Sequence, residues 1–284
     1  MPDRYVFLKG HGTENDFVLL PDHDGSVHGA LAPERVRALC DRRAGIGGDG
    51  VIRVIRTAAY DGPDAGSLGG AEWFMDYRNS DGSLSEMCGN GIRVFVRHLV
   101  DAGLVDGAAP VPVATRDGVK VLTLSGDLVT ADMGAPKVYG QSVVGVGLRS
   151  WPARHVDMGN PHAVAFVDSL DDAGKLYEPP AYDGTTYPHG VNVEFVVRRG
   201  ERHVALRVHE RGSGETRSCG TGACAVMVAA ALHDGLVAEG STPAEDVAYR
   251  VDVPGGTLTV TWTADNRVLL TGPAVVVAEG TTTL

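Results

Sequence analysis

A short cysteine-glycine motif occurs twice in the chain, and its repetition constrains the fold more than any other feature. The first copy, Cys-Gly-Asn-Gly at 88–91, precedes a stretch with helical character that closes at Gly103. The second, Cys-Gly-Thr-Gly at 219–222, precedes a similar stretch that closes at Gly235. From cysteine to closing glycine there are 15 positions in one copy and 16 in the other. Because both ends of the segment match, the sequence predicts one structural unit used twice; two unrelated glycine-rich turns are the alternative.

The repeat predicts two similar domains related by a pseudo-twofold axis, with a boundary near Met133. Apolar runs that contain β-branched residues and are flanked by turn residues predict strands, and helical patterns are fewer. Strands are expected at 5–8, 51–55, 119–124, 204–208 and 258–262, and helices at 32–40, 92–100 and 223–233. The predicted fold class is therefore α+β, with mostly antiparallel sheet.

Composition narrows the range of partners. The net charge of −11 argues against a nucleic acid or an anionic membrane as partner, because either would require a basic face. No window is apolar for long enough to span a membrane, and the first residues lead directly into a predicted strand without a leader peptide. Four cysteines without a Cys-x-x-Cys pair predict neither a disulfide framework nor a structural zinc site, which favours a cytoplasmic protein.

The position of each motif at the start of a predicted helix suggests its chemistry. The first turn of a helix has free backbone N–H groups and a partial positive charge, which favour a thiolate and attract a carboxylate. We therefore expect Cys88 and Cys219 to have lowered pKa values. The glycines that follow leave room for the carboxylate of an amino acid to approach the backbone N–H groups.

Two such turns on either side of one substrate would suit inversion at a carbon atom. A thiolate would remove the α-proton from one face, and a thiol on the opposite face would return a proton. The simpler interpretation is that Cys88 and Cys219 are small buried apolar residues. We assign that role to Cys40 and Cys224 instead, because they lack the glycine turn.

Around these cysteines the sequence resembles the diaminopimelate epimerase family, over nearly the whole chain. The segment 79–83 followed by 87–93 resembles the first catalytic signature of that family, and the segment 210–216 followed by 219–222 resembles the second. Three further motifs match in order: Gly-Thr-Glu-Asn-Asp-Phe at 12–17, Met-Gly-Asn-Pro-His at 158–162 and Gly-Val-Asn-Val-Glu at 190–194.

The resemblance implies an enzyme that interconverts LL- and meso-diaminopimelate with the two cysteines, without pyridoxal phosphate, any other cofactor or a metal, for lysine and peptidoglycan precursor synthesis. It implies two pseudo-symmetric domains, each a mainly antiparallel β-sheet wrapped around a central helix. The domains are expected at 1–132, with 273–284 returning to it, and at 133–272. A cytoplasmic homodimer is also implied.

The same resemblance assigns roles to individual residues. His162 and Glu210 are expected near the cysteines, where they would help to move protons. Backbone N–H groups would hold the reacting carboxylate, at Gly89, Asn90, Gly220 and Thr221. Side chains would bind the rest of the substrate, from Asn15, Asn79, Asn160, Asn192, Glu210 and Arg211. Asp81 is expected only to shape a turn. Glu14 departs from the residue that many members of the family carry at its position, and Gly50 departs from the residue that some members carry.

The segment 45–50 reads Gly-Ile-Gly-Gly-Asp-Gly and matches a dinucleotide-binding pattern. That pattern requires a strand before it and a helix after it, whereas here the predicted order is the reverse. A tight loop is the better interpretation.

Three other functions compete with the epimerase. A proline or hydroxyproline racemase would use the same two cysteines, but its substrate has one carboxylate and gives no role to Glu210 and Arg211. Isomerases of the phenazine-biosynthesis type share the implied fold but lack the cysteine pair. A non-catalytic module that binds amino acids would not need the thiols.

Overall fold

The computed structural model describes residues 4–284, and these form two compact units. One unit extends to Ala131 and includes Gly272–Leu284, and the other is Asp132–Thr271. Each unit is described by itself. Residues 1–3 lie outside the described residues. The predicted first domain begins with them, and the expectation of no leader peptide also concerns them.

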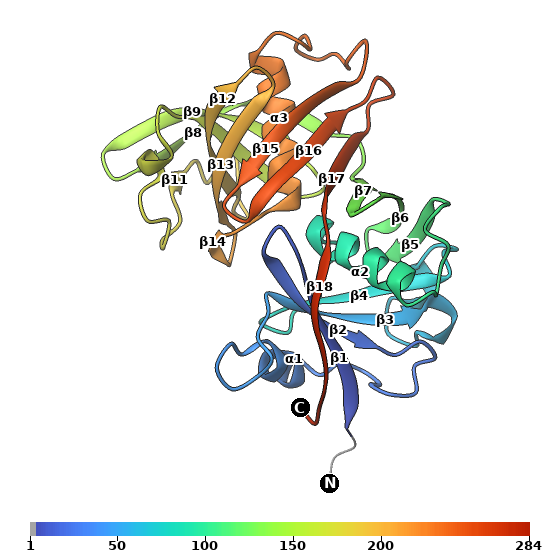
Figure 1. Ribbon diagram of the computed structural model, residues 1–284. Helices are drawn as coiled ribbons and strands as arrows, with labels where there is room; N and C mark the ends of the chain where they lie inside the picture. Colours follow the sequence, from blue (N-terminus) through green and yellow to red (C-terminus); the bar gives the residue numbers. More distant parts are fainter. Residues whose placement is uncertain (1–3) are drawn as a thin grey trace. The chain divides into compact units, whose positions relative to one another are not determined.

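The first unit is a mixed, mainly antiparallel sheet built from both ends of the chain (Figure 1). Its strands are β1 (Tyr5–Gly12), β2 (Asn15–Pro21), β3 (Gly50–Arg56), β4 (Trp73–Asn79), β5 (Val111–Thr115), β6 (Gly118–Ser125), β7 (Leu128–Asp132) and β18 (Val275–Thr282). They pair in the order β18, β1, β2, β3, β4, β5, β6, β7, and only the β2–β3 and β4–β5 pairs are parallel. The C-terminal strand thus supplies one edge of the sheet.

The second unit repeats this order of pairing. Its strands are β8 (Lys137–Val146), β9 (Arg149–Asp157), β10 (Pro161–Phe166), β11 (Ala181–Tyr182), β12 (Asn192–Gly200), β13 (His203–Glu210), β14 (Gly214–Thr216), β15 (Val247–Val253), β16 (Gly256–Trp262) and β17 (Val268–Pro273). They pair in the order β8, β9, β10, β12, β13, β15, β16, β17, again with only the third and fifth neighbours in parallel, β10–β12 and β13–β15. The short strands β11 and β14 pair with β8 and β13. The predicted α+β fold with two similar domains is confirmed.

One long helix lies within the sheet of each unit. The helix α2 (Gly89–Asp101) follows β4, and α3 (Gly220–His233) follows β13 and β14. Both helices bury nearly all of their first ten residues, and from Ala223 to Ala231 every side chain of α3 is buried. Because both helices are buried over most of their length, each sheet packs around its helix.

Most predicted elements match, and the differences lie at helix ends. The helices α2 and α3 begin three residues before the predicted starts, because the glycine turns already have helical backbone although they carry no apolar periodicity. The helix α1 (Pro33–Cys40) has its proline in the first turn, as predicted. The segment 45–50 follows α1 and precedes β3, which is the order that speaks against a dinucleotide site.

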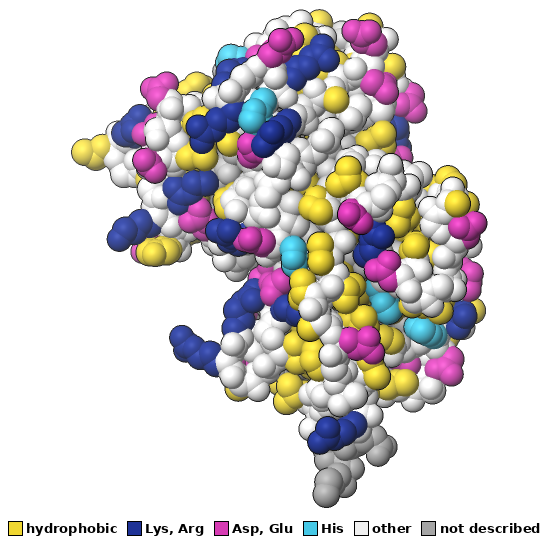
Figure 2. All heavy atoms as spheres, in the orientation of Figure 1, with side chains coloured by type: hydrophobic (Ala, Val, Ile, Leu, Met, Phe, Trp, Pro, Cys, Tyr) yellow, Lys and Arg dark blue, Asp and Glu magenta, His cyan; other side chains and the backbone are white. Residues whose placement is uncertain are grey.

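Charged side chains of both signs are interspersed on the face shown in Figure 2, without an extended basic area. In residues 4–284, no helix has the length and apolar character needed to cross a membrane.

Candidate active site

Each of the two cysteines caps a central helix. Cys88 and Cys219 are the N-cap residues of α2 and α3, in extended backbone conformation. The sulfur of Cys88 accepts a hydrogen bond from the backbone N–H of Gly91 at 3.4 Å, and that of Cys219 accepts one from Gly222 at 3.3 Å. The predicted location of both thiols at helix N-termini is confirmed. Cys40 and Cys224 are buried, as expected for core residues.

In the first unit, Asn15 connects the thiol to the sheet. The thiol of Cys88 donates to Oδ1 of Asn15 across 3.6 Å, and Nδ2 of Asn90 donates to the same oxygen at 3.1 Å. The Nδ2 group of Asn15 donates in turn to Asp49 at 2.7 Å. Asp49 thereby fixes which end of the Asn15 amide faces Cys88.

Asp49 lies in the glycine-rich loop and is itself held by charge. The guanidinium of Arg42 donates to Asp49 and to Asp16, at 2.7 Å in each case, and the backbone N–H of Asp49 donates to the carbonyl oxygen of Asp16. Burial and the neighbouring charge of Asp16 raise the pKa of Asp49, while its hydrogen bonds oppose that shift. The loop at 45–50, which matches a dinucleotide-binding pattern in sequence, therefore orients Asn15 beside Cys88 through Asp49.

Asn79 ends β4 and opens a tight turn. Its Nδ2 donates to the hydroxyl of Ser83 at 3.0 Å, and Asp81 accepts from the backbone N–H of Ser83 at 2.8 Å. Asp81 shapes this turn, as predicted. The φ of Gly82 is +88°, and Pro33 lies within 2.7 Å of where its Cβ would stand, so glycine is required there.

In the second unit, Cys219 is 5% exposed and lies beside carboxylates. It forms a hydrogen bond with Glu210, which also accepts from the hydroxyl of Thr216. Burial raises the pKa of Cys219 well above its ordinary value, and the charges of Glu210 and Glu194 raise it further. The expected lowering of this pKa is therefore wrong, because desolvation and two carboxylates outweigh the helix N-terminus.

A fully buried histidine–carboxylate pair lies on the same sheet. Nδ1 of His162 on β10 is 2.6 Å from Oε1 of Glu194 on β12, and neither side chain has exposed area. Nε2 of His162 is 3.1 Å from Oδ1 of Asn160. Sequence reasoning placed His162 and Asn160 in the site but gave Glu194 no role.

A hydrogen bond joins the side chain of Asn192 to the backbone of Arg211. Oδ1 of Asn192 accepts from the backbone N–H of Arg211 at 2.9 Å, and the guanidinium of Arg211 donates to the carbonyl oxygen of His189 at 3.0 Å. A Cβ atom on Gly190, whose φ is +83°, would lie 2.9 Å from Cδ of Arg211. Glycine at 190 thus leaves room for the Arg211 side chain.

The structure brings some of the predicted residues into contact with the cysteine of their unit. Asn15 and Asn90 contact Cys88 or one another, with Asn79 at the end of a neighbouring strand. Glu210 and Thr221 contact Cys219, with Thr221 at 3.5 Å from the sulfur. Three supporting residues were not predicted: Asp49, Thr216 and Glu194. All three lie in motifs that the sequence displays, but no local pattern reveals their long-range partners.

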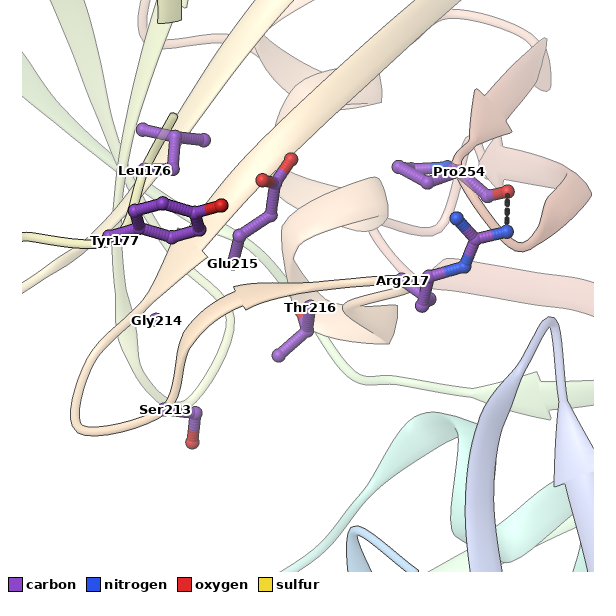
Figure 3. Close-up of a pocket in the computed structure, with 8 residues that line it drawn as sticks. All are labelled: Leu176, Tyr177, Ser213, Gly214, Glu215, Thr216, Arg217 and Pro254. Carbon is purple, nitrogen blue, oxygen red and sulfur yellow. Dashed lines mark hydrogen bonds between the residues drawn. The ribbon is translucent and has the colours of Figure 1, made fainter. Parts of the chain in front are cut away.

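The pocket in Figure 3 is a different feature, with a volume of about 440 Å³. Its lining includes Tyr177, Glu215 and Arg217, and Arg217 donates to the carbonyl oxygen of Pro254. None of the predicted site residues lines it. Within residues 4–284, no group of three or more His, Cys, Asp or Glu side chains has the arrangement of a metal site.

Solved structures with the same architecture show the class of fold. The chain superimposes on a phenazine biosynthesis protein of the PhzF family from Bacillus anthracis with a TM-score of 0.72, at 17% identity and over 99% of both chains. It also superimposes on a hydroxyproline epimerase from Agrobacterium vitis with a TM-score of 0.62, at 15% identity, over 98% of this chain and 91% of the other. The protein therefore has the two-domain fold of these proteins, with a cysteine cap on each central helix.

Sequence comparison identifies the family within this class. The family profile described as diaminopimelate epimerase matches residues 7–139 and 154–277. A diaminopimelate epimerase of Streptomyces coelicolor is 60% identical over 99% of this chain and 96% of its own length. One from Thermobifida fusca is 46% identical over 96% of each chain. The chain belongs to the diaminopimelate epimerase family.

Proposed function

We propose that this protein interconverts LL- and meso-diaminopimelate without a cofactor, in the cytoplasm, for lysine and peptidoglycan precursor synthesis. The observation that carries the proposal is the duplicated helix cap: each domain places one thiol at the N-terminus of its central helix, where the sulfur accepts from a backbone N–H group. The 60% identity to a protein named diaminopimelate epimerase supports this substrate. We also infer a homodimer, as the family resemblance implies.

In the proposed mechanism, Cys88 and Cys219 act on opposite faces of the α-carbon. One thiolate removes the α-proton, and the other residue, as a thiol, donates a proton to the opposite face. The raised pKa of Cys219 favours the thiol form before substrate binds. Backbone N–H groups would stabilise the carboxylate of the planar carbanion, at Gly89, Asn90, Gly220 and Thr221.

The other predicted residues would recognise the rest of the substrate. Arg211 can bind the distant carboxylate with two parallel hydrogen bonds, and Glu210 can pair with an ammonium group or accept the proton of Cys219. The remaining binding residues in the proposal are Asn15, Asn79, Asn160 and Asn192. His162 would move protons within the site.

The test follows the α-proton of LL-diaminopimelate by NMR in D₂O, with reduced protein and no pyridoxal phosphate. Loss of the α-proton signal with appearance of the meso isomer is the expected result. Exchange with proline or hydroxyproline, and none with diaminopimelate, would instead assign a racemase. No exchange with any of these amino acids would favour a binding module.

A further inference from the structure

In the second unit, the side chain of Glu194 on β12 lies beside His162 on β10 and beside the first turn of α3. This side chain is fully buried, one oxygen is 2.6 Å from Nδ1 of His162, and the same oxygen lies 2.8 Å from where a Cβ on Gly222 would stand. The second oxygen, Oε2, has no hydrogen-bond partner among residues 4–284. A buried carboxylate with one free oxygen costs stability, so the fold alone gives no reason for it.

The strand register explains how these groups meet. His162 on β10 pairs with Asn192 on β12, and Glu194 is two residues further along β12. Side chains two residues apart on a strand share a face of the sheet, so His162 and Glu194 are diagonal neighbours on one face. The closeness of Gly222 shows that this face meets the first turn of α3, whose N-terminal dipole favours the carboxylate charge.

The first unit has an apolar pair at the matching positions. There, Phe17 on β2 pairs with Gly50 on β3, and Ile52 is two residues further along β3. Ile52 and Phe17 lie 3.2 and 3.5 Å from where a Cβ on Gly91 would stand, and Gly91 follows its cysteine by three residues, as Gly222 does.

The same architecture is therefore built in one unit on Phe17 and Ile52 and in the other on His162 and Glu194. The apolar pair fills this part of the core without the free-energy cost of removing polar or charged groups from water. The polar pair consequently serves the chemistry of its unit, where Glu210 and Cys219 also lie.

We propose that Glu194 is a positioning residue: it keeps a proton on Nδ1 of His162, so that Nε2 is the nitrogen that gains and loses a proton. This inference rests on the proposed epimerase function. An ionised carboxylate only accepts, so Nδ1 must donate to it. Nε2 then faces Asn160, whose amide can accept from Nε2–H or, after rotation, donate to bare Nε2. Taking up a proton at Nε2 gives an imidazolium paired with Glu194, and releasing it restores the neutral ring.

Several other ionisable groups surround this pair. They are His155 on β9, Tyr187 in the loop before β12, Glu210 on β13 and Cys219 at the start of α3. A variant that changes Glu194 alone keeps these groups constant, so its effect reports on the pair.

The test uses the Glu194→Gln variant, which keeps the shape of the side chain but removes its charge. The ¹⁵N resonances of His162, assigned with a His162→Gln variant, should show in the wild type a protonated Nδ1. In Glu194→Gln the neutral ring should divide between its two tautomers, because a glutamine amide can donate as well as accept and no longer fixes the proton on Nδ1. We expect kcat to fall by about 10- to 100-fold with KM nearly unchanged, by analogy with loss of carboxylates that orient other histidines.

The matched control is Glu201→Gln, an exposed glutamate in the turn between β12 and β13, which should leave the tautomer of His162 and kcat unchanged. A wild-type His162 that is unprotonated at Nδ1, or a tautomer that is identical in Glu194→Gln, would overturn the proposal. A fall in kcat that is matched by a fall in melting temperature, without a change of tautomer, would also overturn it. The NMR measurement needs no diaminopimelate, so failure of the proposed substrate would be recognised separately.

Discussion

Cys88 and Cys219 hold the same place in their respective helices. Each is the N-cap residue, and each sulfur accepts from the N–H group three residues later, at 3.4 and 3.3 Å. Their surroundings differ: the thiol of Cys88 donates to the neutral amide of Asn15, whereas Cys219 lies beside the carboxylate of Glu210. Two matched positions with different electrostatics suit a reaction that needs one base and one acid.

Replacing either capping cysteine should abolish epimerisation. Because each face of the α-carbon needs its own proton carrier, Cys88→Ala and Cys219→Ala should each lower kcat by about 10³-fold or more. The measurement is the appearance of the meso isomer by NMR in D₂O. Cys224→Ala, a buried position in α3, serves as the control and should retain activity. Equal activity of either capping variant and the wild type would exclude the two-base mechanism.

Removing the charge of Glu210 should make Cys219 react at lower pH. Since Glu210 raises the pKa of Cys219, the Glu210→Gln variant should lower that pKa and increase the thiolate fraction at a given pH. The rate of alkylation of Cys219 by iodoacetamide, followed by mass spectrometry from pH 6 to 10, measures this. Glu215→Gln is the matched control, because Glu215 pairs with Arg207 instead. An unshifted profile in Glu210→Gln would show that the charge of Glu210 does not set the reactivity of Cys219.

Alanine at 190 should weaken substrate binding. Its Cβ would displace Arg211, and we expect KM for diaminopimelate to rise by about 10-fold, equivalent to about 1.4 kcal/mol. The control, Gly240→Ala, has a similar φ of +72° but meets no atom within 4 Å. Both variants should lose about 1 kcal/mol of stability from backbone strain, so steady-state kinetics and melting temperature together separate the two effects. A KM that rises equally in both would refute a specific role of Gly190.

Acid should destabilise the protein in part through His28. This side chain is 6% exposed and accepts from Arg35, and burial lowers its pKa from 6.5 to about 4. Because the folded pKa is the lower one, its contribution to stability is complete above pH 6.5 and is lost as the pH falls through 4, by up to about 3 kcal/mol. His28→Gln should therefore lose less stability between pH 7 and pH 4, as measured by urea unfolding. Parallel pH curves for the two proteins would contradict this.

Local sequence was sufficient where a feature depends on neighbours along the chain. The position of both cysteines at helix starts follows from the glycines beside them and the apolar stretch behind them. The turn at Asn79 and Asp81 follows from residue types with known turn preferences. The duplicated fold could be predicted because the repeat retains a pattern at both ends of the helix.

Features that depend on distant residues could not be derived from the same patterns. The pKa of Cys219 is set by carboxylates from β12 and β13 and by burial, none of which is encoded near position 219. The amide of Asn15 meets Cys88 across 73 positions of sequence. Glu194 was visible in a motif, but its pairing with His162 requires the register of β10 and β12.

The edge strand β18 has a consequence for how the protein is made. It pairs with β1 along nearly its whole length, from Tyr5 with Thr282 to His11 with Val275, and it takes the place that β8 takes beside β9 in the second unit. The second unit receives all of its strands in one continuous run of translation. The first unit begins to emerge from the ribosome earlier, yet its sheet lacks an edge until β18, which follows the whole second unit, has been synthesised. The half of the molecule that is translated first is therefore the last that can complete its fold.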